Sequence, residues 1–521
     1  MRQHRFARRL LPRALAVCLG LSTLALPSLA AGKDEVQVIV GHKANAGGSV
    51  RAEVNRGGGR VDHDLSEVDA LVVTMPRAAA QALARNGKVD FVDSPVRRRV
   101  LGSRSIRVAG SQAQAAPYGI AMVQADKLPD SQAGNRRLCI VDSGIDAGHE
   151  DLAGVPMAGE NFTKSGTWNS DENSHGTHVA GTIAALNNAV GVVGVAPSGR
   201  LNLFIAKVFD ASGSATDPQI ARAMMSCARN GANVISMSLG GAEGSRLEAR
   251  VVSRLAKQGV LLIAAAGNDG DNTLSYPAAF PEVVSVAAVD SDKVVAGFSQ
   301  FNADVELAAP GVAVMSTVPA FSQTGASLDV AGSGYAEQSM EGSPRSTATG
   351  ALADFGLGTA AAAGSMTGKV CLIQRGTISF AEKVGNCQAS GGAGAVVYNN
   401  TAGDLVGTLG ETVTAIPSVG ATQADGATLL GQLGQSAEVG VFGLPDLYAA
   451  YSGTSMATPH VSAVAALVWS LNPGCTAAQL RASLNKSTLD LGTAGRDDYY
   501  GNGLVQAKAA HQRIATMGCG S

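Results

Sequence analysis

A serine stands in a tight turn ahead of an apolar run: the segment Gly453–His460 places Ser455 just before residues 461–469. The apolar run predicts a helix, and the first backbone N–H groups of a helix are unpaired and carry partial positive charge. A hydroxyl there can attack a carbonyl group while nearby donors hold the oxyanion that forms. Because a serine at a helix start is more often a simple N-cap, Ser455 needs partners elsewhere in the chain.

Three other segments supply such partners. Residues 138–142 read as an apolar strand that ends in Asp142, and residues 173–181 form a glycine turn into a helix that carries His175. Residues 264–270 form a third glycine-rich turn, which contains Asn268. Asp, His and Ser occur in an order known from serine-protease triads, in which the histidine removes the serine proton and the acid orients the histidine. Four unrelated glycine-rich turns in this order would be a rare coincidence.

These four segments resemble the subtilisin-like serine protease family (subtilases, peptidase S8), and the likeness extends over residues ~113–330 and ~446–515. The resemblance implies a serine endopeptidase that cuts proteins and peptides through an acyl-enzyme. Ser455 would be the nucleophile, His175 the general base and then acid, Asp142 its orienting carboxylate, and Asn268 a side-chain donor to the oxyanion. A catalytically silent relative that binds proteins is the alternative, and the intact four residues favour the enzyme. An α/β-hydrolase esterase is disfavoured because Ser455 lacks the Gly-x-Ser-x-Gly turn.

The N-terminus predicts export. Five arginines within residues 2–13 precede the apolar run Ala14–Leu26, and small residues end at Ala30, so residues 1–30 read as a signal peptide. The run is too short to span a membrane comfortably. A net charge of −2 gives no indication of nucleic acid or an anionic membrane as partner. We expect a secreted monomer.

Residues 31–112 form a separate leader. Strand-like runs at 36–40, 69–74 and 89–92 and a helical run at 78–86 resemble the inhibitory propeptides of subtilases, which makes the leader an intramolecular inhibitor in a zymogen. A small domain retained in the mature protein is the alternative. Arg97–Arg99 and residues 102–116 read as an exposed linker, with the cut expected near residue ~112.

The catalytic domain, residues 113–521, alternates strands and helices as a doubly wound α/β sheet does. Strands are expected at 138–141, 203–208, 234–238, 260–265 and 283–289, with helices at 219–230 and 247–258 between them. Residues 330–445 interrupt this pattern and resemble the β-rich protease-associated (PA) domain inserted in some subtilases. Such an insert could screen substrates, or it could be structural padding.

Two further sets of residues follow from the family resemblance. Residues 238–241 resemble the strand that pairs with substrate backbone. The S1 pocket, which holds the P1 residue, would be bounded by residues 238–240, 265–267 and the turn 275–277, and it has no acidic side chain for Lys or Arg. We expect broad specificity with large apolar P1 residues. The substrate-binding set is Ser238, Leu239, Gly240, Ala265, Ala266 and Gly267. A structural Ca²⁺ would be held by oxygens of Gln114, Asp151, Leu186, Asn188, Val190 and Val192. Without Gln114 and Asp151 in register, a bare Asn-Asn turn would explain that loop.

Six cysteines follow the signal segment, and an even number in an exported chain predicts disulfides. Local spacing favours Cys371 with Cys387, and Cys475 with Cys519. Cys139 and Cys227 are then left to pair with each other, or to stay buried free thiols in their apolar runs.

Overall fold

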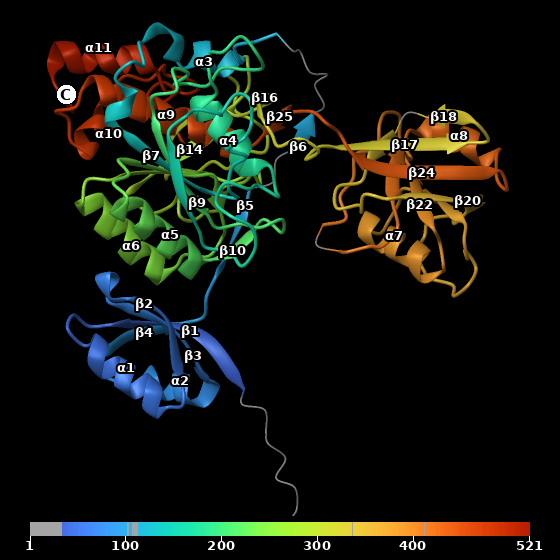
Figure 1. Ribbon diagram of the computed structural model, residues 1–521, viewed down its shortest axis with the longest axis horizontal. Helices are drawn as coiled ribbons and strands as arrows, with labels where there is room; N and C mark the ends of the chain where they lie inside the picture. Colours follow the sequence, from blue (N-terminus) through green and yellow to red (C-terminus); the bar gives the residue numbers. More distant parts are fainter. Residues whose placement is uncertain (1–33, 102–103, 107–112, 336, 411) are drawn as a thin grey trace, which may run out of the picture.

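The computed structural model describes residues 34–101, 104–106, 113–335, 337–410 and 412–521. These residues form an N-terminal body, a larger central body, and a third body beside the central one (Figure 1). The predicted signal peptide lies outside the described residues. Within the described part of the chain, no helix has the length and apolar character needed to cross a membrane.

The N-terminal body is an antiparallel four-stranded sheet, in the order β2-β3-β1-β4, with two helices on one face. Its strands and helices are β1 (Glu35–His42), α1 (Gly47–Arg56), β2 (Arg60–Leu65), β3 (Ala70–Pro76), α2 (Arg77–Leu83) and β4 (Val89–Asp93). The three predicted strands and the predicted helix are present. Helix α1 and strand β2 were not predicted, because their mixed polar sequence has no clear hydrophobic period. Both elements contact β3, with which β2 pairs.

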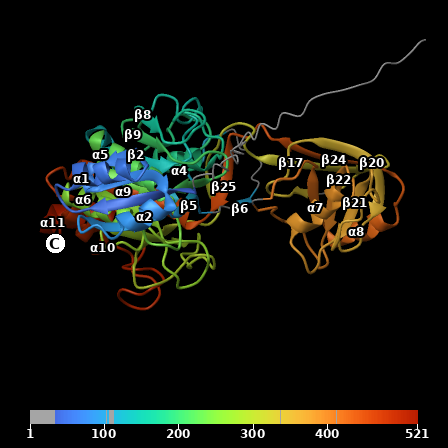
Figure 2. The same cartoon turned by 90° about the horizontal axis from the view of Figure 1, so that it is seen from below.

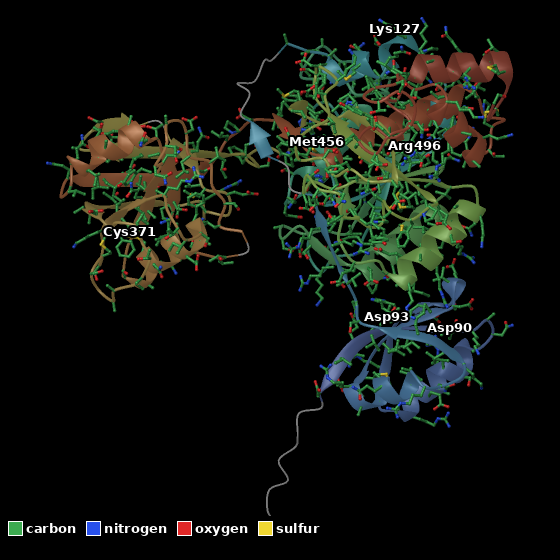
Figure 3. All side chains as sticks on the ribbon, turned by 180° about the vertical axis from the view of Figure 1, so that it is seen from behind. Asp90, Asp93, Lys127, Cys371, Met456 and Arg496 are labelled. Atoms are coloured by element: carbon green, nitrogen blue, oxygen red, sulfur yellow. A yellow bond between two sulfur atoms is a disulfide. The ribbon has the colours of Figure 1, made fainter. Side chains whose placement is uncertain are left out.

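The second face of this sheet packs on the central body. Ile39, Val72 and Phe91 lie in one hydrophobic cluster with Leu247 and Val251 of the central body. Ion pairs flank the contact: Asp93 pairs with Arg246, and Asp90 lies 2.7 Å from Arg250. Figure 3 shows both aspartates on the side of the leader that faces the central body, and Figure 2 shows the leader overlying α5 and α6. The leader is therefore held to the body that carries Ser455 by an apolar face with an ionic rim.

The central body is built on a parallel seven-stranded sheet in the order β15-β14-β13-β11-β7-β9-β8. Its strands are β7 (Arg137–Asp142), β8 (Met157–Asn161), β9 (Asn202–Lys207), β11 (Val234–Met237), β13 (Leu261–Ala265), β14 (Val283–Val289) and β15 (Val305–Pro310). Its helices are α3 (Tyr118–Met122), α4 (His175–Ala184), α5 (Asp217–Arg229), α6 (Arg246–Lys257), α9 (Thr454–Leu471), α10 (Ala477–Asn485) and α11 (Ala507–Met517).

Helices cover both faces of this sheet. Leu138 and Ile140 face a core shared with α4 and α9, whereas Cys139 and Val141 face one shared with α5 and α6. Alternate residues of a strand point to opposite faces, so continuous apolar runs are needed where both faces are buried. The predicted doubly wound α/β fold is confirmed.

The third body is an insertion with its own eight-stranded sheet, in the order β18-β17-β24-β20-β21-β22-β23-β19. Its elements are β17 (Thr324–Val330), β18 (Ser333–Tyr335), β19 (Glu337–Ser339), β20 (Thr347–Asp354), β21 (Val370–Gln374), α7 (Phe380–Ala389), β22 (Gly394–Tyr398), β23 (Ser418–Ala421), α8 (Gln423–Leu430) and β24 (Ser436–Gly443). The predicted start at residue 330 is wrong. Strand β17 pairs along its whole length with β24, so the insertion begins at Thr324.

The insertion leaves the central body beside the serine helix. The chain departs after β16 (Val314–Thr317) and returns in β25 (Tyr448–Ser452), and these two strands pair antiparallel. Strand β25 runs directly into Gly453 and α9. The insertion is thus attached by a strand pair that ends next to Ser455.

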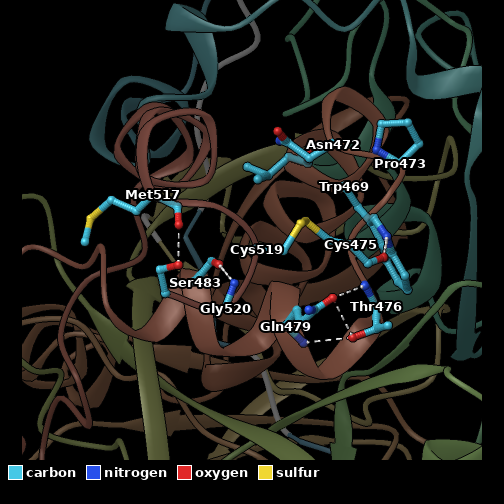
Figure 4. The surroundings of a disulfide bond; sticks show 12 residues. Trp469, Asn472, Pro473, Cys475, Thr476, Gln479, Ser483, Met517, Cys519 and Gly520 are labelled. Carbon is cyan, nitrogen blue, oxygen red and sulfur yellow. Dashed lines mark hydrogen bonds between the residues drawn. A yellow bond between two sulfur atoms is a disulfide. The ribbon is translucent and has the colours of Figure 1, made fainter.

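Three disulfides join cysteines of the described residues: Cys139–Cys227, Cys371–Cys387 and Cys475–Cys519. The predicted pairing is confirmed, and the free-thiol alternative for the first pair is wrong. Figure 4 shows the third bridge, next to which Trp469 Nε1 donates to the carbonyl of Cys475 at 2.8 Å. This bridge fastens the C-terminal end of the chain to the start of α10.

Candidate active site

Ser455 is the second residue of α9 and is completely buried. Its Oγ donates to the carbonyl oxygen of Ser238 at 3.2 Å, and its own carbonyl accepts from Ser238 Oγ at 2.8 Å. The helix start predicted from the sequence is present, and it puts the serine hydroxyl against the end of β11.

Asp142 and His175 form a buried pair. Asp142 ends β7 and His175 begins α4, and His175 Nδ1 lies 2.8 and 3.0 Å from the two carboxylate oxygens. A backbone N–H from Ser143 also donates to Asp142 at 2.8 Å. An ionised carboxylate only accepts hydrogen bonds, so the proton sits on Nδ1 and leaves Nε2 as an acceptor. That Nε2 is buried and has no hydrogen-bond partner among the described residues.

The other buried histidines near the serine have structural contacts. His178 Nε2 lies 3.0 Å from the carbonyl oxygen of Val314, and its ring stacks on Tyr451. His460 Nδ1 lies 2.8 Å from the carbonyl oxygen of Met456. Burial lowers the pKa of His178 to about 3 and that of His460 to about 4, which keeps both neutral.

Asn268 follows β13 and is held by the residue before the serine. Its Oδ1 accepts from the backbone N–H of Thr454 at 2.9 Å and from its hydroxyl at 2.8 Å. Because Oδ1 accepts both hydrogen bonds from Thr454, the amide group is oriented with its Nδ2 away from Thr454 and close to Gly453. Thr454 was missed in the sequence analysis, although its position beside Ser455 was a signal.

A segment of the chain itself lies across Ser455. Strand β5 (Arg97–Val100) pairs antiparallel with β12 (Leu239–Gly240) on one side and β10 (Ser214–Thr216) on the other. The next residue, Leu101, has its carbonyl oxygen 3.5 Å from Ser455 Oγ. The prediction of an exposed linker over 97–99 is wrong, because two neighbouring strands satisfy its backbone and bury Arg98.

A second segment of the chain, residues 104–106, pairs with the strand that leads into the serine helix. Strand β6 (Arg104–Ile106) pairs antiparallel with β25, which precedes Gly453. The described segments 97–100 and 104–106 are thus each paired with a neighbouring strand, as the backbone of a polypeptide substrate would be.

The predicted substrate-binding residues lie around this segment. Ser238, Leu239, Ala265 and Ala266 are buried at the ends of β11 and β13 and in β12. A Cβ atom on Gly240 would lie 3.3 Å from the Leu101 side chain. Gly267 has a φ of +117°, and a Cβ there would overlap Gln300. Gly240 therefore lies next to the side chain of Leu101, whose carbonyl oxygen makes the 3.5 Å contact with Ser455.

The six predicted calcium ligands meet in one place. The Gln114 amide nitrogen lies 2.8 Å from the carbonyl oxygen of Leu186, 3.1 Å from that of Val190, 3.4 Å from that of Val192, and 3.3 Å from Asn188 Oδ1. Asp151 is fully buried, its Oδ2 accepts from Val192 N–H, and its Oδ1 has no partner among the described residues.

This oxygen-rich arrangement fits a hard cation. The amide nitrogen and oxygen of Gln114 exchange places when the amide group is rotated by half a turn. The rotated amide would add its oxygen to the group of oxygens that now faces the nitrogen. Oxygen-only ligands of this kind suit Ca²⁺. In the described part of the chain, no cluster of three or more His, Cys, Asp or Glu side chains could hold a metal.

Known proteins are similar to this chain in sequence. The Subtilase family profile matches residues 135–383 and 433–503. Subtilisin DY of Bacillus licheniformis is 44% identical over 218 residues, which are 41% of this chain and 78% of that protein. Subtilisin NAT of Bacillus subtilis subsp. natto is 35% identical over 319 residues, 59% of this chain and 80% of that protein.

Two solved structures extend the comparison. The psychrophilic subtilisin-like protease Apa1 of the Antarctic Pseudoalteromonas sp. AS-11 has 40% identity and a TM-score of 0.55, over 78% of this chain and all of that one. Fervidolysin of Fervidobacterium pennivorans, described as keratinolytic and related to subtilisin, has a TM-score of 0.60 over 92% of this chain and 61% of that one; at 21% identity it supports the fold alone. The family match spans the strand ends and helix starts that carry the site, and this chain belongs to the subtilase family as a subtilisin-like serine endopeptidase.

Proposed function

We propose that the protein is exported as an inactive precursor and becomes an active endopeptidase with Ser455 as nucleophile, His175 as base and Asp142 as its orienting carboxylate. The observation that carries the proposal is the 3.5 Å contact between Ser455 Oγ and the carbonyl of Leu101, in a segment paired as a peptide would be. The alternative of a silent relative has no observation in its favour.

In the reaction, rotation of the serine side chain brings Oγ to the acceptor Nε2 of His175, which takes the hydroxyl proton as Oγ bonds to the substrate carbonyl carbon. The imidazolium is stabilised by Asp142 and returns the proton to the leaving amine. Asn268 Nδ2 and the N–H groups at the start of α9 donate to the oxyanion. Water then attacks the acyl-enzyme, and the same histidine transfers its proton.

The first substrate is the leader itself. We place the first cut between Leu101 and Gly102, eleven residues before the boundary near ~112 expected from the sequence. Leu101 then occupies the P1 position, in keeping with the expected preference for large apolar residues there. The leader, docked on α5 and α6, remains as an inhibitor until it is removed.

Three further expectations belong to this function. The basic and apolar N-terminus supports secretion. A Ca²⁺ held by the Gln114–Asp151 group would stabilise the folded protein, because it binds that state and not the unfolded chain. The insertion is proposed to be a PA domain, and its strand pair β16–β25 would let it influence which proteins reach Ser455.

The nucleophile is tested by the processing of the precursor. Ser455→Ala, expressed in a host free of extracellular proteases, should stay joined to its leader, whereas the wild-type protein should yield a fragment that begins at Gly102. Intact mass and N-terminal sequencing measure both. Ser462→Ala is the matched control, since Ser462 is buried in the same helix and bonds Ser236, and it should be processed. A cut after Leu101 in Ser455→Ala would remove Ser455 from the mechanism.

A further inference from the structure

Strand β5 buries one of its three arginines and exposes the other two. Arg97 and Arg99 are exposed, whereas the Arg98 side chain has no solvent-accessible surface. Residues alternate between the two sides of a strand, so the side that faces the central body takes Arg98 and Val100. Counting back from Leu101 at P1, Arg98 is the P4 residue.

The Arg98 guanidinium ends on a buried carboxylate. Glu248, in the first turns of α6, is also completely buried. Arg98 Nε lies 3.1 and 3.2 Å from the two Glu248 oxygens, and Nη2 lies 2.5 Å from Oε2. The remaining nitrogen, Nη1, donates to the carbonyl of Arg97 at 3.0 Å. A planar guanidinium facing both carboxylate oxygens is a geometry that lysine cannot reproduce.

A second carboxylate stands beside the first. Asp217 Oδ1 accepts from the N–H of Val96 at 2.9 Å, and its own N–H donates to the Val96 carbonyl at 3.0 Å. Its Oδ2 accepts from Ser245, whose hydroxyl also caps α6 by accepting from Glu248 N–H. Asp217 thus holds the backbone two residues before Arg98 and adds negative charge to the same region.

The backbone leaves room for the long arginine side chain. A Cβ atom on Gly241 would lie 3.1 Å from Arg98 Nη1, 3.6 Å from Arg98 Cδ and 2.7 Å from the Arg97 carbonyl oxygen. The glycine after β12 therefore lets the stem of Arg98 pass to α6.

Stability alone gives no reason for a glutamate here. Burial raises the pKa of Glu248 to about 7, even though Arg98 lowers it, and Asp217 raises it further. A buried carboxylate that loses its partner is costly, and an apolar side chain at such a position is often as stable or more so. The position is explained if a cation occupies it during function.

We propose that Glu248, supported by Asp217, makes the S4 subsite, which holds the P4 residue, selective for arginine. The preferred substrates are then proteins with Arg at P4 and a large apolar residue at P1. This inference rests on the proposed function and deepens it. Release of the leader would open to substrates the position that Arg98 fills in the precursor. The Arg98–Glu248 pair would then serve twice, first in self-processing and afterwards in substrate choice.

The test compares two peptides of equal composition and charge. Acetylated Ala-Arg-Ala-Val-Leu-Gly-Ser carries arginine at P4, and acetylated Ala-Ala-Arg-Val-Leu-Gly-Ser carries it at P3, where the leader has the exposed Arg99. The processed wild-type enzyme should cut the first with a kcat/KM about ten- to a hundred-fold higher, the range for hydrogen bonds to a charged partner. Equal values for the two peptides would overturn the proposal without the need for any variant.

Two variants locate the effect. Glu248→Gln should bring the ratio of the two kcat/KM values close to one. Glu243→Gln removes the same charge from an exposed position five residues earlier and should keep the wild-type ratio. A retained ratio in Glu248→Gln would also overturn the assignment.

The outcome separates this inference from the proposed function. If both peptides are cut after leucine at equal rates, the endopeptidase activity is supported and the arginine-selective S4 subsite is refuted. If neither peptide is cut and a fluorophosphonate fails to label Ser455, the proposed function itself falls.

Discussion

The preference for arginine at P4 should depend on pH through the ionisation of Glu248. The charged groups that face this carboxyl are the guanidinium of Arg98 from β5 and the carboxyl of Asp217 from the start of α5. Burial raises the pKa of Glu248 to about 7 in the arginine-filled subsite. Burial also raises the pKa of Asp217, so both carboxyls gain their proton at higher pH than usual.

The direction and the size of the pH effect on the P4 preference follow from the pKa of Glu248. A carboxyl with a raised pKa is neutral below it, and the attraction for arginine is present above about pH 7 and lost as the pH falls. At pH 5.5 roughly 3% of such carboxyls are ionised, against roughly 97% at pH 8.5. The P4 preference should therefore shrink by up to about thirty-fold between these two values. Its midpoint should lie above pH 7, because kcat/KM reports the enzyme with this subsite empty, where Arg98 no longer lowers the pKa of Glu248.

The assay is the ratio of kcat/KM for the P4-Arg and P3-Arg peptides, measured from pH 5.5 to 8.5 at constant ionic strength. Any effect of pH on the catalytic step that is common to both peptides cancels in the ratio, and arginine stays charged throughout. Glu248→Gln should give a flat ratio near one. A wild-type ratio that is large and constant over this range, or that grows at low pH, would refute the role of the Glu248 charge.

Two other predictions concern the oxyanion and the cation. Asn268→Ala should lower kcat about 10²–10³-fold, the loss known for this kind of donor in subtilisin, with little change in KM. The reason is that the donor acts on charge present only in the transition state. An unchanged kcat would exclude Asn268 from the oxyanion site. EDTA should lower the Tm of the wild-type protein, since Ca²⁺ at a hundred times its Kd stabilises by about 2.7 kcal/mol. Asp151→Asn should reduce that calcium-dependent difference in Tm, and an equal difference in both proteins would place the ion elsewhere.

The sequence alone determined the features that are encoded locally. Asp142, His175, Asn268 and Ser455 each lie within two residues of a glycine, at the end of an apolar strand or the start of a helix, so residue type and neighbours sufficed to make them candidates. Strands buried on both faces appear as continuous apolar runs, which is why five of the seven strands of the central sheet were predicted. Strands β8 and β15 were not predicted, and β8 lies at the edge of the sheet with no fully buried residue. The leader's α1 and β2 escaped prediction because their residues are polar and gain order only from packing on β3.

Tertiary structure decided what depends on pairing between distant segments. Three consecutive arginines look like a solvated linker, and only the pairing of β5 with β10 and β12 turns Arg98 inward to a carboxylate 150 residues away. Glu248 likewise looks like an ordinary charged residue of an amphipathic helix. Strand pairing sets which side chains face which neighbours, and it puts a buried charge opposite its partner, so the specificity of the site lies in contacts that no single segment contains.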